Sequence, residues 1–303
     1  MIKTEKLTKI YDAVKAVDSL TFELESGNVV GFLGPNGAGK TTTMRMLAGY
    51  LPPTSGRASV MGMDVSENAF EVKKSVGYLP ENNPLYTDMT PIEYLEFCAD
   101  IRGMGPKEKN RRIREVIEIC GLQDAAVRQI SVLSKGFKQR VGIAQAVLHD
   151  PPVLLLDEPT SGLDPNQIQE IRNLINELKG RKTIIISTHI MQEVQAVCQR
   201  VVIINAGKIV ADGTQDELTS KGKTVYAVKL AGPSEEVLSE LEKLGSVEKI
   251  VRTGDLFKIE TSGQDPRRQI FETAVKKDWT ILEMQKLQHS LEEVFRNLTS
   301  GEE

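Results

Sequence analysis

The chain has 303 residues, of which 40% are hydrophobic and 26% are charged, and its formal net charge is −4. This composition excludes a disordered or low-complexity chain, and the length predicts one large core with a smaller second domain. The slight acidic balance argues against a nucleic-acid-binding protein, which would carry a clear excess of positive charge.

The longest apolar runs, residues 153–156 and 201–204, are far shorter than the roughly 18 residues that a membrane-spanning helix requires. The first six residues lack the features of a secretory signal, so we expect a cytosolic protein. Cys98, Cys120 and Cys198 are far apart and show no C-x-x-C spacing, which predicts small core residues and neither disulfides nor a zinc site.

Two apolar runs near the start, residues 2–7 and 19–24, predict antiparallel strands that lead into the core. Tyr11 lies between these runs, on a predicted loop. Its ring can stack on a nucleobase, although an exposed tyrosine in a turn is the ordinary interpretation of such a residue.

The most specific stretch lies between a predicted buried strand at 28–33 and a predicted helix at 41–50. It matches the phosphate-binding pattern G-x-x-x-x-G-K-[ST], and its residues are Gly34, Pro35, Asn36, Gly37, Ala38, Gly39, Lys40, Thr41 and Thr42. Glycines let the backbone approach phosphates closely, and the helix N-terminus adds partial positive charge. We expect Lys40 at the β- and γ-phosphate oxygens and Thr41 at Mg²⁺, so the stretch predicts a nucleoside triphosphate site.

A turn at 52–56 comes next, followed by predicted strands at 58–61 and 76–79 and predicted helices at 93–101 and 106–120. Thr90, Pro91 and Glu93 form a capping signal for the first of these helices. In the second helix, basic residues accompany apolar residues at helical spacing, so we interpret the run as the solvated face of an amphipathic helix. This run comprises Lys107, Lys109, Arg111, Arg112 and Arg114.

Strands and helices then alternate, with helices predicted beyond Ser134, at 165–179 and at 191–198, and strands at 153–157 and 183–187. Such alternation predicts a mainly parallel sheet covered on both faces. Asp157 ends the first of these strands and Glu158 follows it. An acidic pair also occurs in plain turns, but the phosphate-binding stretch favours Asp157 as a Mg²⁺ ligand and Glu158 as the group that polarises the attacking water.

The pattern changes at about residue 221. Strands are predicted at 224–230, 247–261 and 280–286, with a hairpin around Gly254, and helices at 234–244, 267–277 and 291–298. We interpret residues 221–303 as a separate small α+β domain, compatible with a ferredoxin-like β-α-β-β-α-β arrangement. It carries no phosphate-binding or catalytic motif, so we expect a regulatory or dimer-stabilising role; the alternative is a unit that simply buttresses the core of the first domain.

These motifs in this order resemble the ATP-binding subunits of ABC transporters. Residues 133–140, Leu-Ser-Lys-Gly-Phe-Lys-Gln-Arg, are similar to the family signature usually written LSGGQ, and residues 161–164 are similar to its D-loop. The resemblance covers residues 1–220. It implies an α/β fold, namely a P-loop NTPase core with an antiparallel β subdomain and a helical signature subdomain at about 82–135.

The resemblance also implies roles for individual residues. Ser134 and Gly136 would reach a γ-phosphate, Asp164 would lie at the nucleotide, and Tyr11 would stack on adenine. His189 would donate a hydrogen bond to the γ-phosphate, whereas we interpret His149 and His289 as structural residues.

Two stretches depart from the family pattern. Lys135 and Phe137 replace a glycine and a glutamine of the signature, but the retained Ser134 and Gly136 should preserve phosphate recognition. Glu81 stands where the family generally has a glutamine near Mg²⁺, so we expect it to act as a metal ligand and to alter how the nucleotide state is communicated.

In that family the signature of one subunit faces the phosphate loop of another, which implies a homodimer or a closely similar partner subunit. The resemblance implies ATP and Mg²⁺ as cofactors, a separate transmembrane permease, and a position at the inner face of the membrane through that permease alone. Residues 290–295 resemble the ending of exporter-type subunits, which favours export.

The alternative is an ABC-type ATPase that acts on nucleic acid or ribosomes. Such a protein usually has two ATPase modules or a long coiled-coil insertion. This chain has one module, and only 92 residues separate Lys40 from Leu133. A kinase would have no use for the signature or for His189.

Overall fold

The structure, a computed structural model, describes residues 1–220, 224–231, 234–261, 265–287 and 290–299, so His289 lies outside the described residues. The chain divides into two compact units, Met1–Gly213 and Thr214–Glu303. The domain boundary that we place at residues 220–221 from the sequence stays a prediction.

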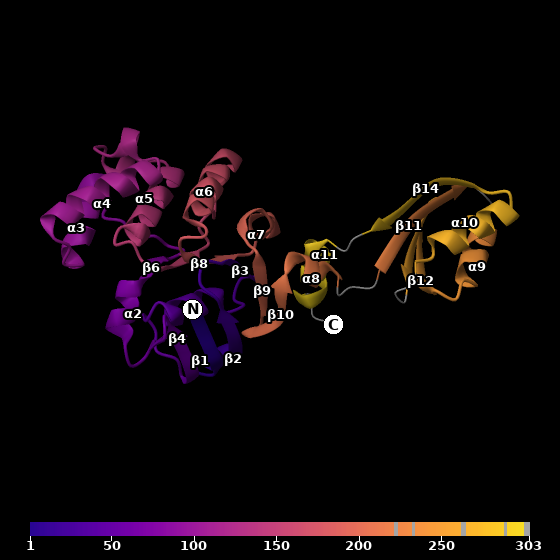
Figure 1. The fold of residues 1–303 in the computed structure, drawn as a ribbon, viewed down its shortest axis with the longest axis horizontal. Coiled ribbons are helices and arrows are strands. Elements are labelled where there is room, and N and C mark those ends of the chain that lie inside the picture. The colour runs from indigo at the N-terminus through magenta and orange to yellow at the C-terminus, as the bar shows by residue number, and fades with distance from the viewer. Residues whose placement is uncertain (221–223, 232–233, 262–264, 288–289, 300–303) are drawn as a thin grey trace. The chain divides into compact units, whose positions relative to one another are not determined.

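A six-stranded sheet with the order β10-β9-β3-β8-β7-β6 organises the first unit (Figure 1). Its strands are β3 (Val29–Leu33), β6 (Val76–Leu79), β7 (Val153–Asp157), β8 (Thr183–Thr188), β9 (Arg200–Asn205) and β10 (Lys208–Thr214). β3 pairs in parallel with β8 and β9, and β7 pairs in parallel with β6 and β8. β3, β7 and β8 are buried along their whole length, as expected of a sheet covered on both faces. The predicted mainly parallel sheet is confirmed.

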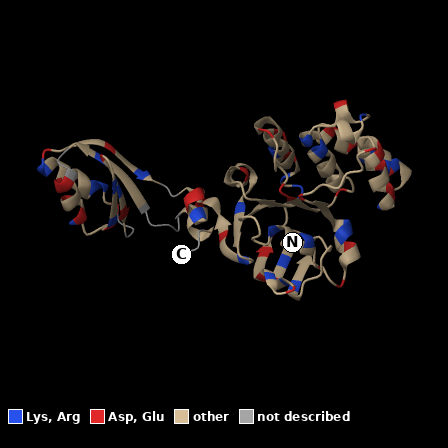
Figure 2. Cartoon of the chain, turned by 180° about the vertical axis from the view of Figure 1, so that it is seen from behind, with Lys and Arg blue, Asp and Glu red and all other residues tan. Residues whose placement is uncertain are grey.

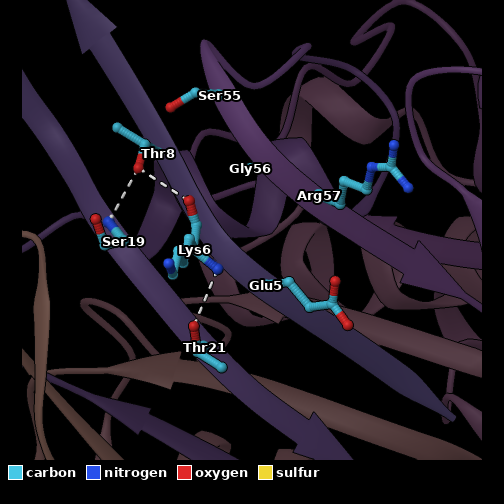
Figure 3. A pocket seen from close by; sticks show the side chains of 8 residues that line it. All are labelled: Glu5, Lys6, Thr8, Ser19, Thr21, Ser55, Gly56 and Arg57. Atoms are coloured by element: carbon cyan, nitrogen blue, oxygen red, sulfur yellow. Dashed lines mark hydrogen bonds between the residues drawn. The ribbon is translucent and has the colours of Figure 1, made fainter.

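An antiparallel sheet with the order β2-β1-β4-β5 forms a second layer. Its strands are β1 (Ile2–Tyr11), β2 (Val14–Leu24), β4 (Ser55–Val60) and β5 (Met63–Asp64). The β1–β2 register shifts where Lys6 and Ser19 adopt positive φ angles. Hydroxyl groups stabilise this bulge, because Thr21 Oγ1 accepts from Lys6 N, and Thr8 Oγ1 accepts from Ser19 N and donates to Lys6 O (Figure 3). Residues of this bulge also line an open hollow over the strands, together with Ser55, Gly56 and Arg57 of β4 (Figure 3).

Helix α1 (Lys40–Leu47) packs between the two sheets. Its Met44, Met46 and Leu47 join a core with Leu7 and Phe22 of the antiparallel sheet and with alternate residues of the parallel strands. This apolar layer anchors the helix whose N-terminus closes the phosphate-binding stretch.

Further helices complete the first unit, with α5, α6 and α7 on the face of the six-stranded sheet opposite the antiparallel sheet (Figure 1). They are α2 (Ala69–Ser75), α3 (Pro91–Ile101), α4 (Pro106–Ile119), α5 (Lys135–Val147), α6 (Pro165–Leu178) and α7 (Met191–Val197), with 3₁₀ turns at Gln123–Ala125 and Ile130–Val132. α3, α4 and α5 pack on one another as a helical group. Thr90 and Glu93 form the predicted capping box at the start of α3.

The second unit contains a four-stranded sheet with the order β12-β13-β11-β14. Its elements are α8 (Gln215–Ser220), β11 (Thr224–Ala231), α9 (Ser234–Glu242), β12 (Val247–Thr253), β13 (Leu256–Thr261), α10 (Arg267–Lys276), β14 (Thr280–Leu287) and α11 (Leu291–Thr299). From β11 to β14 the element order is β-α-β-β-α-β, with a core around Val228, Val237, Phe257 and Ile259. α8 packs against α11, where Leu218 and Leu291 are buried.

Among the helices and strands that the structure describes, the sequence-based expectations missed α2, α8, β5, β9 and β10. α2 buries only Val72, so its sequence shows little helical periodicity.

The prediction for Arg112 was wrong. We expected its side chain on a solvated helix face, but it is only 5% exposed. Its guanidinium donates to the carbonyls of Leu148 and Val147 and thereby satisfies the end of α5.

Basic and acidic residues are interspersed along the elements of both units (Figure 2). Within the described residues, no helix is both long enough and apolar enough to cross a membrane.

Candidate functional site

The phosphate-binding stretch forms a tight loop between β3 and α1. Gly39 has a φ of 101°, and a Cβ there would lie 2.4 Å from the carbonyl oxygen of Ala16. A Cβ on Gly34 would lie 2.4 Å from the carbonyl oxygen of Ile204. Glycine is therefore required at both positions, because any other residue would push the loop away from its neighbours.

A hollow of about 360 Å³ opens over this loop. Its lining comprises Ala16, Asn36, Gly37, Ala38, Gly39, Lys40, Thr41, Thr42, Glu81 and Glu158. Most of the phosphate-binding residues predicted from the sequence thus lie together, with two carboxylates that follow other strands.

Lys40 is 6% exposed. Its Nζ donates to the carbonyl oxygens of Gly34 at 2.8 Å and Pro35 at 3.2 Å. It also lies 3.4 Å from Oε1 of Glu158. A buried ammonium needs such partners, and the same donors can turn to phosphate oxygens.

Asp157 and Glu158 stand at the end of β7, whose neighbour β8 ends at Thr188. The Ser187 hydroxyl donates to Asp157 Oδ1, and the Glu158 amide donates to Ser187 O at 3.0 Å. Glu158 has a φ of 48°, which is unusual for a residue with a side chain. This backbone geometry turns the Glu158 carboxylate towards Lys40, and such strain is typical of functional positions.

His189 follows β8 and completes the group. Its Nδ1 lies 3.0 Å from Oε2 of Glu158, and its side chain is 45% exposed. One carboxylate therefore contacts a buried cation on one side and a solvent-accessible imidazole on the other.

Asp157 is fully buried, and its Oδ2 has no hydrogen-bond partner in the structure. An orphaned carboxylate oxygen costs free energy unless a cation or water satisfies it. Among the described residues, no group of three or more His, Cys, Asp or Glu side chains could hold a metal ion. A single carboxylate such as that of Asp157 nevertheless fits Mg²⁺, because this ion is usually held by one or two carboxylates together with substrate phosphates and water.

The phenol of Tyr78 in β6 is influenced by the buried Asp157 carboxylate. Burial, with a smaller contribution from the negative charge of Asp157, raises the pKa of Tyr78 to about 12. The Tyr78 phenol therefore stays neutral at physiological pH.

The other predicted nucleotide contacts lie outside this hollow. Ser134 caps α5 by accepting from Phe137 N at 3.3 Å, and Gly136 packs so closely on Gln167 that a Cβ would lie 2.6 Å from its side chain. Asp164 caps α6 by accepting from the amides of Asn166 and Gln167, each at 3.0 Å. Tyr11 is the last residue of β1, not a loop residue as expected, and it is 42% exposed. The nucleotide-binding roles of these four residues stay predictions.

The sequence analysis missed Glu193 and the two threonines that connect it to the segments of Glu158 and His189. Glu193 of α7 is 3% exposed and accepts hydrogen bonds from Thr160 and Thr188. The available signal was a carboxylate beside Met191 and Val194, which are also buried in this helix.

The glycine-rich loop between a parallel strand and a helix, its buried lysine and the carboxylate pair on a nearby strand together define a P-loop nucleoside triphosphatase. The family model described as ABC transporter matches residues 17–161 of the chain.

Known proteins narrow the class further. The bacitracin transport ATP-binding protein BcrA of Bacillus licheniformis is 40% identical over 240 residues, which are 78% of each chain. The linearmycin resistance ATP-binding protein LnrL of Bacillus subtilis is 32% identical and covers 99% of this chain and 98% of its own. A solved ATP-binding subunit of an ABC transporter is 31% identical, covers 73% of this chain and 92% of its own, and has a TM-score of 0.66. The chain belongs to the ATP-binding proteins of ABC transporters and is an ATPase.

Proposed function

We propose that this ATPase energises transport, in the export direction, through a separate membrane permease. The observation that carries the ATPase chemistry is the contact of Glu158 with both Lys40 and His189. The names of BcrA and LnrL, which refer to bacitracin transport and linearmycin resistance, support export.

The residues at the loop have separable roles in this proposal. Lys40 and the loop amides bind the phosphates, and the Glu158 carboxylate orients and polarises the attacking water. His189 donates a hydrogen bond to the γ-phosphate and keeps Glu158 in place. Thr41, Asp157 and Glu81 would hold Mg²⁺, which when bound supplies charge neutralisation at the phosphate oxygens.

Two copies of this chain, or one copy and a closely similar subunit, would form the working unit. Ser134 is exposed at the N-terminus of α5 and lies outside the hollow over its own phosphate loop. A helix N-terminus attracts anions, so it is suited to a nucleotide held by another subunit. ATP binding then closes the dimer and hydrolysis reopens it.

A second hollow of the first unit supports the permease contact. It has a volume of about 420 Å³, and its lining includes the exposed apolar residues Tyr50, Phe70 and Ile101. Three cations, Lys73, Lys74 and Arg102, also line it, and this fully described part of the chain contributes no carboxylate to the lining. An exposed apolar patch with one sign of charge favours a partner segment that carries apolar and acidic side chains. We propose that such a segment of the permease docks here and holds the ATPase at the inner face of the membrane.

Co-purification from native membranes tests this proposal. The membrane protein that is retained with the wild-type chain is identified, and the same isolation is repeated with the pair Lys73→Glu and Lys74→Glu. We expect this pair to lose the membrane protein while keeping ATP binding. The pair Lys107→Glu and Arg111→Glu, on exposed positions of α4, makes the same charge change elsewhere and should retain it. Retention by both pairs would place the docking surface elsewhere, and isolation of the chain with ribosomes or nucleic acid would overturn the transport function.

A further inference from the structure

Glu193 is a buried carboxylate that the catalytic roles described above do not use. It lies on α7 with 3% exposure, and its two oxygens accept from two different threonines. The Thr160 hydroxyl donates to Oε1, and the Thr188 hydroxyl donates to Oε2 at 2.6 Å. Both threonines are themselves buried.

The positions of these threonines in the chain connect Glu193 to the reaction. Thr160 comes two residues after Glu158, and Thr188 comes immediately before His189. Glu193 therefore joins the loop that leaves β7 to the end of β8. Glu158 has a positive φ, so the loop that carries it depends on outside contacts to keep its conformation.

A carboxylate suits this task because it offers two acceptor oxygens to two hydroxyl donors. A glutamine of the same size offers one acceptor oxygen, and its amide donors would face the second hydroxyl. Hydrogen bonds to a charged group inside a protein are also stronger and more directional than neutral ones.

We propose that Glu193 is a positioning residue, which holds Thr160 and Thr188 and thereby sets the separation of Glu158 and His189 during hydrolysis. The proposal rests on the roles assigned above to Glu158 and His189. A displacement of about 1 Å in a reacting group can lower a rate about 100-fold, whereas ATP is bound mainly by the phosphate loop. Loss of Glu193 therefore acts on kcat and leaves KM for ATP nearly unchanged.

The test measures steady-state ATP hydrolysis by the full chain with Glu193→Gln. We expect kcat to fall about tenfold or more and KM for ATP to stay within about twofold. Thr160→Val should lower kcat in the same way, and Thr160→Ser, which keeps the hydroxyl, should restore it. The double variant Glu193→Gln with Thr160→Val should be little slower than the slower single variant, because both changes break one interaction.

Val194→Ala provides the matched control. Val194 neighbours Glu193 on α7 and packs against Gly31 of β3, so its truncation loosens the same helix without touching the threonines. We expect a lower melting temperature and a kcat within about twofold of wild type.

Two results would overturn the proposal: a Glu193→Gln kcat within about twofold of wild type, or an equal loss of kcat in Val194→Ala at the same loss of stability. If Glu193→Gln does not fold, the comparison of Thr160→Val with Thr160→Ser decides on its own. These results test the role of Glu193 separately from the proposed catalytic roles of Glu158 and His189. The catalytic roles would be refuted only if Glu158→Gln or His189→Ala hydrolysed ATP normally.

Discussion

Nδ1 of His189 lies 3.0 Å from Oε2 of Glu158, although the two residues follow different strands and are far apart in the sequence. The other oxygen of the same carboxylate lies 3.4 Å from Lys40 Nζ. Glu158 is 6% exposed, so these contacts fix its carboxylate at the edge of the hollow over the phosphate loop. A carboxylate held in this way can polarise one water molecule in a defined direction.

Glu158→Gln should retain ATP binding with Mg²⁺ but hydrolyse ATP about 100-fold more slowly or worse, because an amide keeps the size and cannot accept a proton from water. The variant should therefore accumulate as a closed dimer at saturating ATP. Size-exclusion chromatography with light scattering, together with turnover measurements, checks both effects. A monomer with normal turnover would remove Glu158 from the catalytic role.

Lys40→Ala should weaken ATP binding about 10-fold to 100-fold, because a charged hydrogen bond contributes about 1.5–3 kcal/mol. It should also abolish hydrolysis. Titration with ATP and a thermal melt without nucleotide separate binding from folding, and we expect the melt to change little. Unchanged turnover would exclude this loop as the phosphate site.

Glu81→Gln should raise the Mg²⁺ concentration needed for half-maximal hydrolysis several-fold, since it removes a carboxylate that lines the hollow. It should also strengthen ATP binding in the absence of Mg²⁺, because the carboxylate repels the triphosphate. Glu118→Gln, at an exposed position of α4, removes the same charge at a distance and serves as the control. Identical Mg²⁺ dependence in the two variants would show that Glu81 is not a metal ligand.

Ser134→Arg should leave ATP binding to the monomer intact and prevent dimer closure, because in the proposed dimer Ser134 would contact the nucleotide of the opposite subunit. Mixed with Lys40→Ala subunits, it should form dimers with one doubly damaged site and one intact site. Each variant alone should be inactive. If one intact site suffices, we expect the mixture to recover part of the ATPase activity. Weaker ATP binding by Ser134→Arg monomers would contradict the geometry across subunits.

A chain that ends after Ser220 should remain folded and bind ATP, because every nucleotide motif lies before this point. Its dimerisation or its coupling to the permease should change. This truncation also removes α11, which packs on α8, so some loss of thermal stability is expected. A chain in which a short Gly-Ser linker replaces residues 221–289 keeps α11 and separates the two effects. Failure of the truncated chain to gain thermal stability with ATP would show that both units form one cooperative structure.

Local patterns in the sequence predicted much of the fold. The apolar runs of β3 and β7 and the Thr90–Glu93 capping box were predictable, because each depends on neighbouring residues. Weakly periodic elements were missed, since α2 buries a single side chain and gains its stability from the residues around it. The burial of Arg112 was also unpredictable, because its carbonyl partners, Val147 and Leu148, lie at the C-terminal end of α5, distant in the chain.

The sequence by itself determined the chemistry of the protein: a phosphate-binding loop, a carboxylate pair and the family signature are recognisable because their spacing follows from local backbone geometry. Only the tertiary structure decided which groups act on one another. The parallel order β3-β8-β7 brings the carboxyl ends of three strands to one edge, so that Lys40 and His189 meet Glu158. The contacts of Glu193 arise in the same way, since two threonines from separate segments donate to a single buried carboxylate. Such contacts depend on strand order and on packing over long chain separations, and neither is encoded in local spacing.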